Sequence, residues 1–278
     1  MILDAKTMLS FFDSAGRSRY YHWCADIVLA GEDYKVNEVV FFVSDIEDPL
    51  SDYIWLKKYM NSFLLVGVYT KDDVLISECM EYIDTLRNEF GEIELRTPFP
   101  CALDSDSILK RFSLEQVQDL PNPVYYIDSQ SELLNYTGNI ELSITQLSDE
   151  DRNEIANNVK LGKLDRESWG DGSFKPRTDF KDVKIYIARL KGEIIGYLRA
   201  ECGYMNVYDI GWLYIEPSFR GMGYAAALVS YFSREMFNAD LVPHYGYAIS
   251  EQSARVAQKC GYKCDETSLI CKVLKNLY

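Results

Sequence analysis

The sequence predicts an α/β (α+β) protein with a mixed, mostly antiparallel sheet flanked by helices, preceded by a smaller α/β domain. Three patterns support this fold class. Residues 183–202 have the pattern of two strands joined by a tight turn at residues 191–193. Residues 210–226 have the pattern of a strand that runs through a glycine turn into a helix, and residues 63–96 that of strand, helix and strand.

The length of 278 residues favours two domains, which we place at 1–138 and 139–278. The stretch 122–139 is the expected boundary region, because Pro121 directly precedes it and it holds Pro123 and several turn-forming residues. In the second half we expect a strand at 140–147, a helix opening at Ser148 and a long loop over 162–182. The remaining expected elements are strands at 183–190, 194–202 and from 207, a helix from 225, a strand at 243–249, a helix through 260 and a strand at 266–274.

In the first half, the strand, helix and strand are expected at 63–69, 72–90 and 92–96. Lys71, Asp72 and Asp73 stand at the start of that helix, where a glycine-rich turn would be needed to hold an anion. The carboxylates of the two aspartates would repel a phosphate group. The first half is therefore expected to have no active site of its own.

Composition limits the classes of function. The net charge of −14 and the pI near 4.7 argue against nucleic-acid binding and suit a cationic partner, although an acidic balance also serves solubility. The seven cysteines show no paired C-x-x-C spacing and there are two histidines, so we predict reduced thiols and no metal site. No apolar run approaches the ~20 residues of a membrane helix and no secretory signal is visible. We therefore expect a cytoplasmic protein that does not bind membranes.

The stretch 210–226 is the most informative part of the chain. Pro217 ends the strand because it lacks a backbone N–H, and Gly221 and Gly223 permit backbone angles that other residues avoid. The helical pattern starts at Ala225, directly after these glycines. The first amides of a helix have no intrahelical partner and lie at the positive end of its dipole. The loop is therefore predicted to bind an anion.

Arg220, Gly223 and Ala225 fit the motif Arg/Gln-x-x-Gly-x-Gly/Ala, and Gly261-Tyr262 follows a strand and a helix further on. From about residue 140 to the end, the chain resembles the GNAT superfamily of acyl-CoA-dependent N-acyltransferases. The resemblance implies acetyl-CoA (CoA) as the cofactor, its pyrophosphate held by backbone amides after Arg220 and its pantetheine arm by the backbone of the preceding strand. The implied cofactor-binding residues are Leu213, Tyr214, Ile215, Arg220, Gly221, Met222, Gly223, Tyr224, Ala225 and Ala226.

The resemblance also implies catalytic residues. Asp209 lies where many members have a glutamate that acts as general base, and a water relay would suit its shorter side chain. The tyrosine that many members use as general acid is replaced here by Ala257. The remaining candidates for an acid are His244, Tyr247, Tyr245, Ser253 and bulk water; we take His244 and Tyr247 as the catalytic candidates beside Asp209.

The amine acceptor is expected on the side of the long loop. Trp169, Asp171 and Phe174 are the candidate substrate-binding residues, because aromatic and acidic groups suit an organic cation. A tryptophan that pins this loop to the core is the alternative interpretation of Trp169.

The expected function is transfer of an acetyl (acyl) group from acetyl-CoA to a primary amine of a small molecule or peptide, by direct attack in a ternary complex. Nothing places a base beside Cys202, so a cysteine nucleophile is not expected. One alternative is a non-catalytic GNAT-fold module that binds or senses acyl-CoA. The other is a tandem transferase that uses aminoacyl-tRNA. The resemblance also implies that the first half, 1–138, could be a degenerate GNAT-like copy, since several tandem members of the family carry one ahead of the catalytic half. The sequence gives no indication of the acyl chain length or the oligomeric state.

Overall fold

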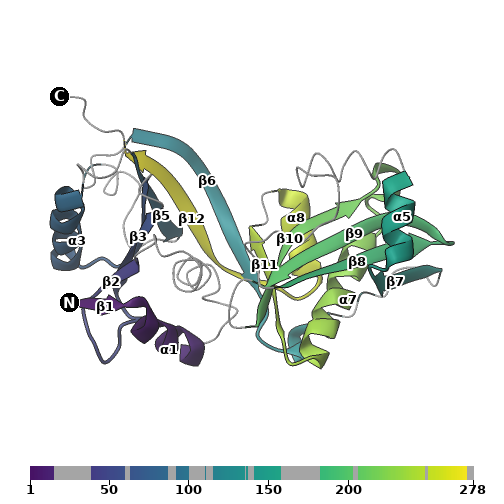
Figure 1. The fold of residues 1–278 in the computed structure, drawn as a ribbon, viewed down its shortest axis with the longest axis horizontal. Coiled ribbons are helices and arrows are strands. Elements are labelled where there is room, and N and C mark those ends of the chain that lie inside the picture. Colours follow the sequence, from purple (N-terminus) through teal and green to yellow (C-terminus); the bar gives the residue numbers. More distant parts are fainter. Residues whose placement is uncertain are drawn as a thin grey trace. The chain divides into compact units, whose positions relative to one another are not determined.

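The structure is a computed structural model that describes residues 1–15, 39–59, 63–86, 92–99, 110, 115–134, 136, 141–157, 182–202, 206–247 and 250–273. The chain divides into two compact units. Unit 1 consists of Met1–Tyr125, Tyr247–Ile249 and Cys264–Tyr278, and unit 2 of Tyr126–Gly246 and Ser250–Lys263. Each unit holds its own sheet strands and helices (Figure 1).

Unit 1 is built on strands β1 to β5, which pair in chain order, and on β12, which joins them from the end of the chain. Strands β1 to β4 form an antiparallel series, β5 lies parallel to β4, and β12 runs antiparallel to β5. The elements are β1 (Ile2–Asp4), α1 (Ala5–Ala15), β2 (Val39–Val43), β3 (Tyr53–Tyr59), β4 (Phe63–Tyr69), α3 (Asp73–Leu86), β5 (Glu92–Phe99), β6 (Glu115–Tyr126) and β12 (Lys263–Val273).

Helix α3 covers one face of this sheet because its apolar residues recur at helical spacing. Its buried residues are Leu75, Ile76, Cys79, Ile83 and Leu86. They form one apolar cluster with buried residues of β2, β3 and β4. Burial in this cluster raises the pKa of the Cys79 thiol to about 12.

Unit 2 has the same kind of sheet. Strands β7, β8, β9 and β10 pair antiparallel in chain order, and β11 lies parallel to β10. The elements are the short helix η1 (Gln130–Glu132), β7 (Leu142–Gln146), α5 (Asp149–Asn157), β8 (Asp182–Leu190), β9 (Glu193–Cys202), β10 (Val207–Ile215), the short helix η2 (Pro217–Phe219), α7 (Tyr224–Asn238), β11 (Val242–Tyr247) and α8 (Glu251–Lys259).

The two units repeat one topology. Each begins with a strand and a helix, continues with three antiparallel strands, and then passes through a helix to a parallel strand. The helices that precede the parallel strands are α3 in unit 1 and α7 in unit 2. The first half of the chain thus has the strand order expected of a degenerate copy of the second.

Helices cover both faces of the unit 2 sheet. Helix α7 buries Val229, Phe232 and Met236, and the Phe232 ring meets the Tyr186 ring of β8 at a centroid distance of 5.9 Å. On the other face, Ile155 of α5 packs in a cluster with Ile187 and other residues of β8 and β9. These two contacts fix the helices against the central strands of the sheet.

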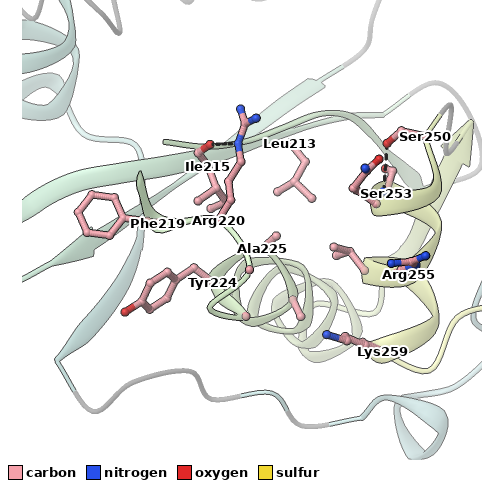
Figure 2. A pocket seen from close by; sticks show the side chains of 15 residues that line it. Leu213, Ile215, Phe219, Arg220, Tyr224, Ala225, Ser250, Ser253, Arg255 and Lys259 are labelled. Atoms are coloured by element: carbon pink, nitrogen blue, oxygen red, sulfur yellow. Dashed lines mark hydrogen bonds between the residues drawn. The ribbon is translucent and has the colours of Figure 1, made fainter. Parts of the chain in front are cut away.

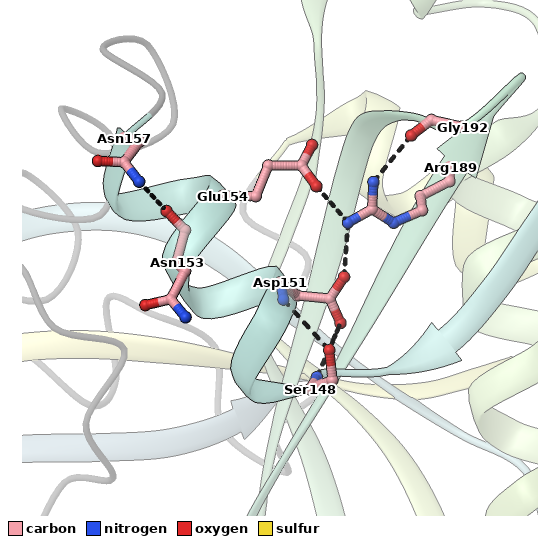
Figure 3. Close-up of polar contacts among 7 residues, drawn as sticks. All are labelled: Ser148, Asp151, Asn153, Glu154, Asn157, Arg189 and Gly192. Atoms are coloured by element: carbon pink, nitrogen blue, oxygen red, sulfur yellow. Dashed lines mark hydrogen bonds and ion pairs between the residues drawn. The ribbon is translucent and has the colours of Figure 1, made fainter.

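A polar network holds α5 at its start (Figure 3). Ser148 and Asp151 cap the helix reciprocally: the Asp151 N–H donates to Ser148 Oγ over 3.1 Å, and Ser148 N–H donates to Asp151 Oδ2 over 2.7 Å. Arg189 Nη2 of β8 donates to Asp151 Oδ1 and to Glu154 Oε2, both over 2.6 Å, and Nη1 to the carbonyl oxygen of Gly192 over 2.8 Å. One guanidinium therefore joins α5 to the β8–β9 turn.

The predicted fold class is confirmed, and the described elements of the second half begin and end within three residues of the predicted positions. The region expected to hold the domain boundary starts inside a strand, because β6 continues to Tyr126. The compact units also differ from the predicted ranges, since residues 126–138 lie in unit 2 and most of β12 in unit 1. The independence of 1–138 and 139–278 as folding domains stays a prediction.

None of the helices in the described ranges combines the length and apolar character that a bilayer-spanning helix needs.

Candidate active site

The loop between β10 and α7 is held in shape by its own residues. Pro217–Phe219 forms a single helical turn, and Arg220 Nε donates to the carbonyl oxygen of Ile215 over 2.8 Å. This bond closes the loop back on the end of β10. Gly221 and Gly223 then have φ angles of +79° and +87°, a region that favours glycine.

Helix α7 begins directly after Gly223, which is its N-cap and has no side chain to cap it. The N–H of Ala227 donates to the carbonyl oxygen of Gly223 over 3.0 Å, so the amides of the three preceding residues lie before the first intrahelical bond. The N–H groups of these residues lie at the positive end of the helix dipole. This is the arrangement that the glycine turn predicted.

A pocket of about 670 Å³ opens at this helix start (Figure 2). The volume lies within the range of small-molecule sites, roughly 300–1,000 Å³. All of its lining belongs to unit 2: Leu213, Ile215, Phe219, Arg220, Gly221, Gly223, Tyr224, Ala225, Ala226, Ser250, Gln252, Ser253, Arg255, Val256 and Lys259.

The predicted cofactor-binding residues are therefore brought together, with two exceptions. Tyr214 does not line the pocket; its ring lies 5.7 Å from that of Tyr197 and its hydroxyl donates to Glu216 Oε2 over 3.3 Å. Met222 does not line it either, and 58% of this residue is exposed. Their predicted roles rest on backbone groups, so they stay predictions.

The second wall of the pocket comes from α8 and was missed by the sequence reasoning. Arg255 and Lys259 line the pocket across from Arg220 (Figure 2). Their spacing of four residues on a predicted helix was the available signal, because it places two cations on one helix face. The Ser250 side chain starts this helix by accepting from the N–H of Ser253 over 3.1 Å.

Asp209 and His244 meet at the third registered pair of β10 and β11. His244 Nδ1 lies 2.8 Å from Asp209 Oδ1. An ionised carboxylate can only accept, so with Asp209 in that form Nδ1–H is the donor. The His244 side chain is fully buried, whereas 21% of the Asp209 side chain is exposed. Of this pair, Asp209 is the group that can reach a reactant, and His244 fixes the orientation of its carboxylate.

The candidate acids separate into different environments. Ala257, at the position of the usual tyrosine, is fully buried in α8. One turn earlier on the same helix, Ser253 lines the pocket, and its hydroxyl oxygen lies 2.7 Å from that of the buried Tyr245. Tyr247 lies at the end of β11, and its side chain is outside the described set.

A buried ion pair stands next to Asp209 and was also missed. Arg199 Nη2 lies 2.6 Å from Glu201 Oε1, with 6% and 11% of the two side chains exposed. Glu201 is opposite Asp209 in the register of β9 and β10. Two charged residues inside an otherwise apolar strand were the signal in the sequence.

In unit 1, the start of the corresponding helix α3 is capped by the side chain of Asp72. Asp72 Oδ1 accepts from the N–H of Val74 over 2.9 Å, and Thr70 Oγ1 accepts from the N–H of Asp72 over 2.9 Å. The carboxylate thus takes the position at the start of α3 that an anion would need.

Trp169, Asp171 and Phe174, the candidate acceptor wall, lie outside the described residues.

Comparison with known proteins bears on the fold and on the family of the second half. Among solved structures, the chain is similar to a GCN5-related N-acetyltransferase from Kribbella flavida (12% identity, TM-score 0.54, 80% of this chain and 87% of that one). It is also similar to a Drosophila protein (12% identity, TM-score 0.57, 99% of this chain and 97% of that one). A further similar structure is a functionally unknown conserved protein from Staphylococcus epidermidis (10% identity, TM-score 0.50, 88% of this chain and 93% of that one). At these identities the similarity shows the fold. A search of curated proteins finds no match. Residues 150–262, which hold the pocket and the Asp209–His244 pair, match the model of the acetyltransferase (GNAT) family.

Proposed function

We propose that the protein transfers an acetyl group from acetyl-CoA to a primary amine by direct attack in a ternary complex. The observation that carries this proposal is the pocket at the start of α7, which is lined by three cationic side chains and by the residues whose amides precede the first intrahelical bond. The family match of residues 150–262 supports acyl transfer in general. The donor and the class of acceptor are our inference.

The pocket residues fit an acyl-CoA. The amides of residues 224–226 and the side chains of Arg220, Arg255 and Lys259 offer donors and positive charge to a diphosphate. Each hydrogen bond to a charged group contributes about 1.5–3 kcal/mol in mutational series. An overall charge of −14 is therefore compatible with an anionic ligand, because the binding charge is local.

The pocket and Asp209 share strand β10. Leu213 lines the pocket four residues after Asp209, which corresponds to roughly 13 Å along a strand. A linear arm bound along β10 would bring a thioester from the anion-binding loop to the carboxylate. Among the described pairs, the register of β10 with β11 runs to Asp209 and His244, before the pocket residues of β10 begin.

Acetyl-CoA supplies the reactive thioester when bound, and the chain handles the protons. As the amine nitrogen bonds to the acyl carbon, Asp209 takes the proton that the nitrogen loses, directly or through a water. The C–S bond breaks and the sulfur leaves as a thiolate. His244 holds the Asp209 carboxylate in place through the 2.8 Å bond to its Nδ1.

We assign protonation of the leaving thiolate to Ser253, with Tyr245 as the group that replenishes its proton. Ser253 lines the pocket, and the two hydroxyl oxygens lie 2.7 Å apart. This pair takes the place of the tyrosine that Ala257 replaces. Because a thiolate is a tolerable leaving group, this step needs less assistance than the deprotonation of the amine.

The acceptor is proposed to be a cationic amine of a small molecule or peptide, in keeping with the acidic composition. We place the reaction in the cytoplasm, which is supported by the free thiols of Cys79 and Cys260.

Titration of acetyl-CoA by calorimetry, followed by a thiol-release assay with a panel of amines, tests the proposal. Binding in the micromolar range with turnover of at least one amine is expected. Tight binding with no turnover of any amine would favour a non-catalytic acyl-CoA-binding module. A salt-sensitive complex with aminoacyl-tRNA, together with absent acetyl-CoA binding, would favour the tandem aminoacyl-tRNA transferase instead.

A further inference from the structure

Residues 128–134 and 136, here called the strap, follow β6 and run along α7. At one end, Gln130 Nε2 donates to Asn238 Oδ1 over 3.3 Å, at the C-terminal end of α7. In the middle, Ser230 Oγ donates to the carbonyl oxygen of Leu134 over 3.0 Å, and the Leu134 N–H donates to the carbonyl oxygen of Cys260 over 3.0 Å. The strap is therefore fixed to α7 by the Gln130 side chain and the Leu134 carbonyl, and to the end of α8 by the Leu134 N–H.

The far end of the strap lies against the coenzyme loop. A methyl group on Gly223 would be 2.2 Å from Tyr136 Oη and 2.5 Å from Tyr136 Cε1. The hydroxyl edge of this ring thus occupies the space that any other residue would need at the N-cap of α7. Among the described residues, nothing lies within 4 Å of the corresponding position on Gly221, so Gly223 and not Gly221 is the loop glycine that Tyr136 contacts.

The second glycine of the sequence pattern meets the same strap. A methyl group on Gly261 would be 2.1 Å from the carbonyl oxygen of Glu132. Gly223 and Gly261 both have φ near +90°, at +87° and +93°, so backbone conformation and packing demand glycine together. One segment outside the two glycine motifs therefore packs against both of them.

We propose that Tyr136 is a positioning residue for the coenzyme: its ring seats Gly223 and thereby fixes the α7 amides in their binding arrangement. This inference rests on the proposed acyl-CoA site, and Tyr136 itself does not line the pocket. A glycine at positive φ has many alternative conformations, and binding weakens in proportion to the fraction of molecules in the competent one. The ring restricts Gly223 to that conformation.

The test compares acetyl-CoA affinity among variants of the full chain. Tyr136→Ala is expected to weaken binding about three- to tenfold, because the loop is less ordered before binding. Tyr136→Phe keeps the ring and is expected to bind like the wild type. Leu134→Ala is the matched control, since it removes an exposed side chain from the same strap and leaves its backbone contacts in place. It should change neither affinity nor thermal stability appreciably.

A double-mutant cycle tests the contact itself. Gly223→Ala should reduce affinity and melting temperature more in the wild-type background than in Tyr136→Ala, where the methyl group has room and only the positive φ remains unfavourable. Additive losses would contradict the contact.

Three outcomes would overturn the inference. Unchanged affinity in Tyr136→Ala, with the wild type binding normally, would reject Tyr136 as a positioning residue and leave the proposed function intact. Equal losses in Tyr136→Phe and Tyr136→Ala would mean that the hydroxyl contacts the ligand directly. A wild-type protein that does not bind acetyl-CoA would overturn the proposed function, and this inference with it.

Discussion

Substitution of Arg189 by alanine removes the three hydrogen bonds that join α5 to the β8–β9 turn (Figure 3). The bond to Asp151 matters most, because only 8% of that side chain is exposed. A hydrogen bond to a charged group typically contributes about 1.5–3 kcal/mol. Glu154 is 45% exposed and adds at most about 1 kcal/mol. The contributions are not additive, so we expect a total loss of about 2–3 kcal/mol.

Hydrogen exchange of the α5 amides measures this loss locally, without assuming that both units unfold together. A loss of about 2–3 kcal/mol corresponds to roughly 30- to 150-fold lower protection factors for residues 149–157. Arg152→Ala is the matched control, because Arg152 and Asp149 form a pair of 3.7 Å on the exposed side of the same helix. It should lower protection less than about threefold. Equal effects of the two substitutions would refute the reasoning.

Acid should reproduce part of this loss. Burial by itself raises the pKa of Asp151, but the bonds from Arg189 and Ser148 outweigh it and leave the pKa below its usual value. A lowered folded-state pKa gives a contribution that is present above the unfolded pKa, near 4, and is lost as pH falls through the folded value. Wild-type α5 should therefore lose protection below about pH 4, and Arg189→Ala should lose less.

The remaining predictions concern the proposed chemistry. Asp209→Asn should lower turnover by about 10²–10⁴ at pH 7 and recover in part toward pH 9, where more amine is neutral; an unchanged pH profile would exclude Asp209 as the base. Tyr245→Phe should lower kcat about tenfold with the Kd for acetyl-CoA unchanged, because its hydroxyl reaches the pocket through Ser253; a weaker Kd with normal kcat would contradict this role. Lys259→Glu should weaken acetyl-CoA binding about tenfold at low salt and less at high salt. Lys191→Glu, at the exposed β8–β9 turn, makes the same change in net charge and should leave the affinity unchanged. Equal effects of the two substitutions would contradict a specific role of the Lys259 charge in the pocket.

The fold of the second half could be predicted because the residues that end its helices and strands lie close to those ends in the sequence. The turn at residues 191–193, the glycines at 221 and 223 and the cap at Ser250 mark element ends within a few residues of sequence. In the first half, β1, α1, β2, β3 and β6 were not predicted. Strand β6 contains two prolines, which argue against a strand on local grounds. Pairing with distant strands overrides that local preference.

The candidate site was predictable to the extent that it is made of backbone. The anion-binding loop needs only glycines and a helix start, both of which are read from consecutive residues. The pairing of Asp209 with His244 depends on the parallel register of β10 and β11 across α7, which no local pattern specifies. The packing of Tyr136 on Gly223 likewise joins residues that are far apart in the sequence.

The most direct test of the acyl-CoA site is calorimetric titration of acetyl-CoA into the Ala225→Asp and Ala225→Asn variants. Ala225 lines the pocket in the first turn of α7, where a carboxylate stabilises the helix through its dipole but repels a diphosphate. The account predicts that Ala225→Asp keeps or raises the melting temperature and loses acetyl-CoA binding at least tenfold more than Ala225→Asn. Equal affinities of the two variants would contradict an anion site at this helix start.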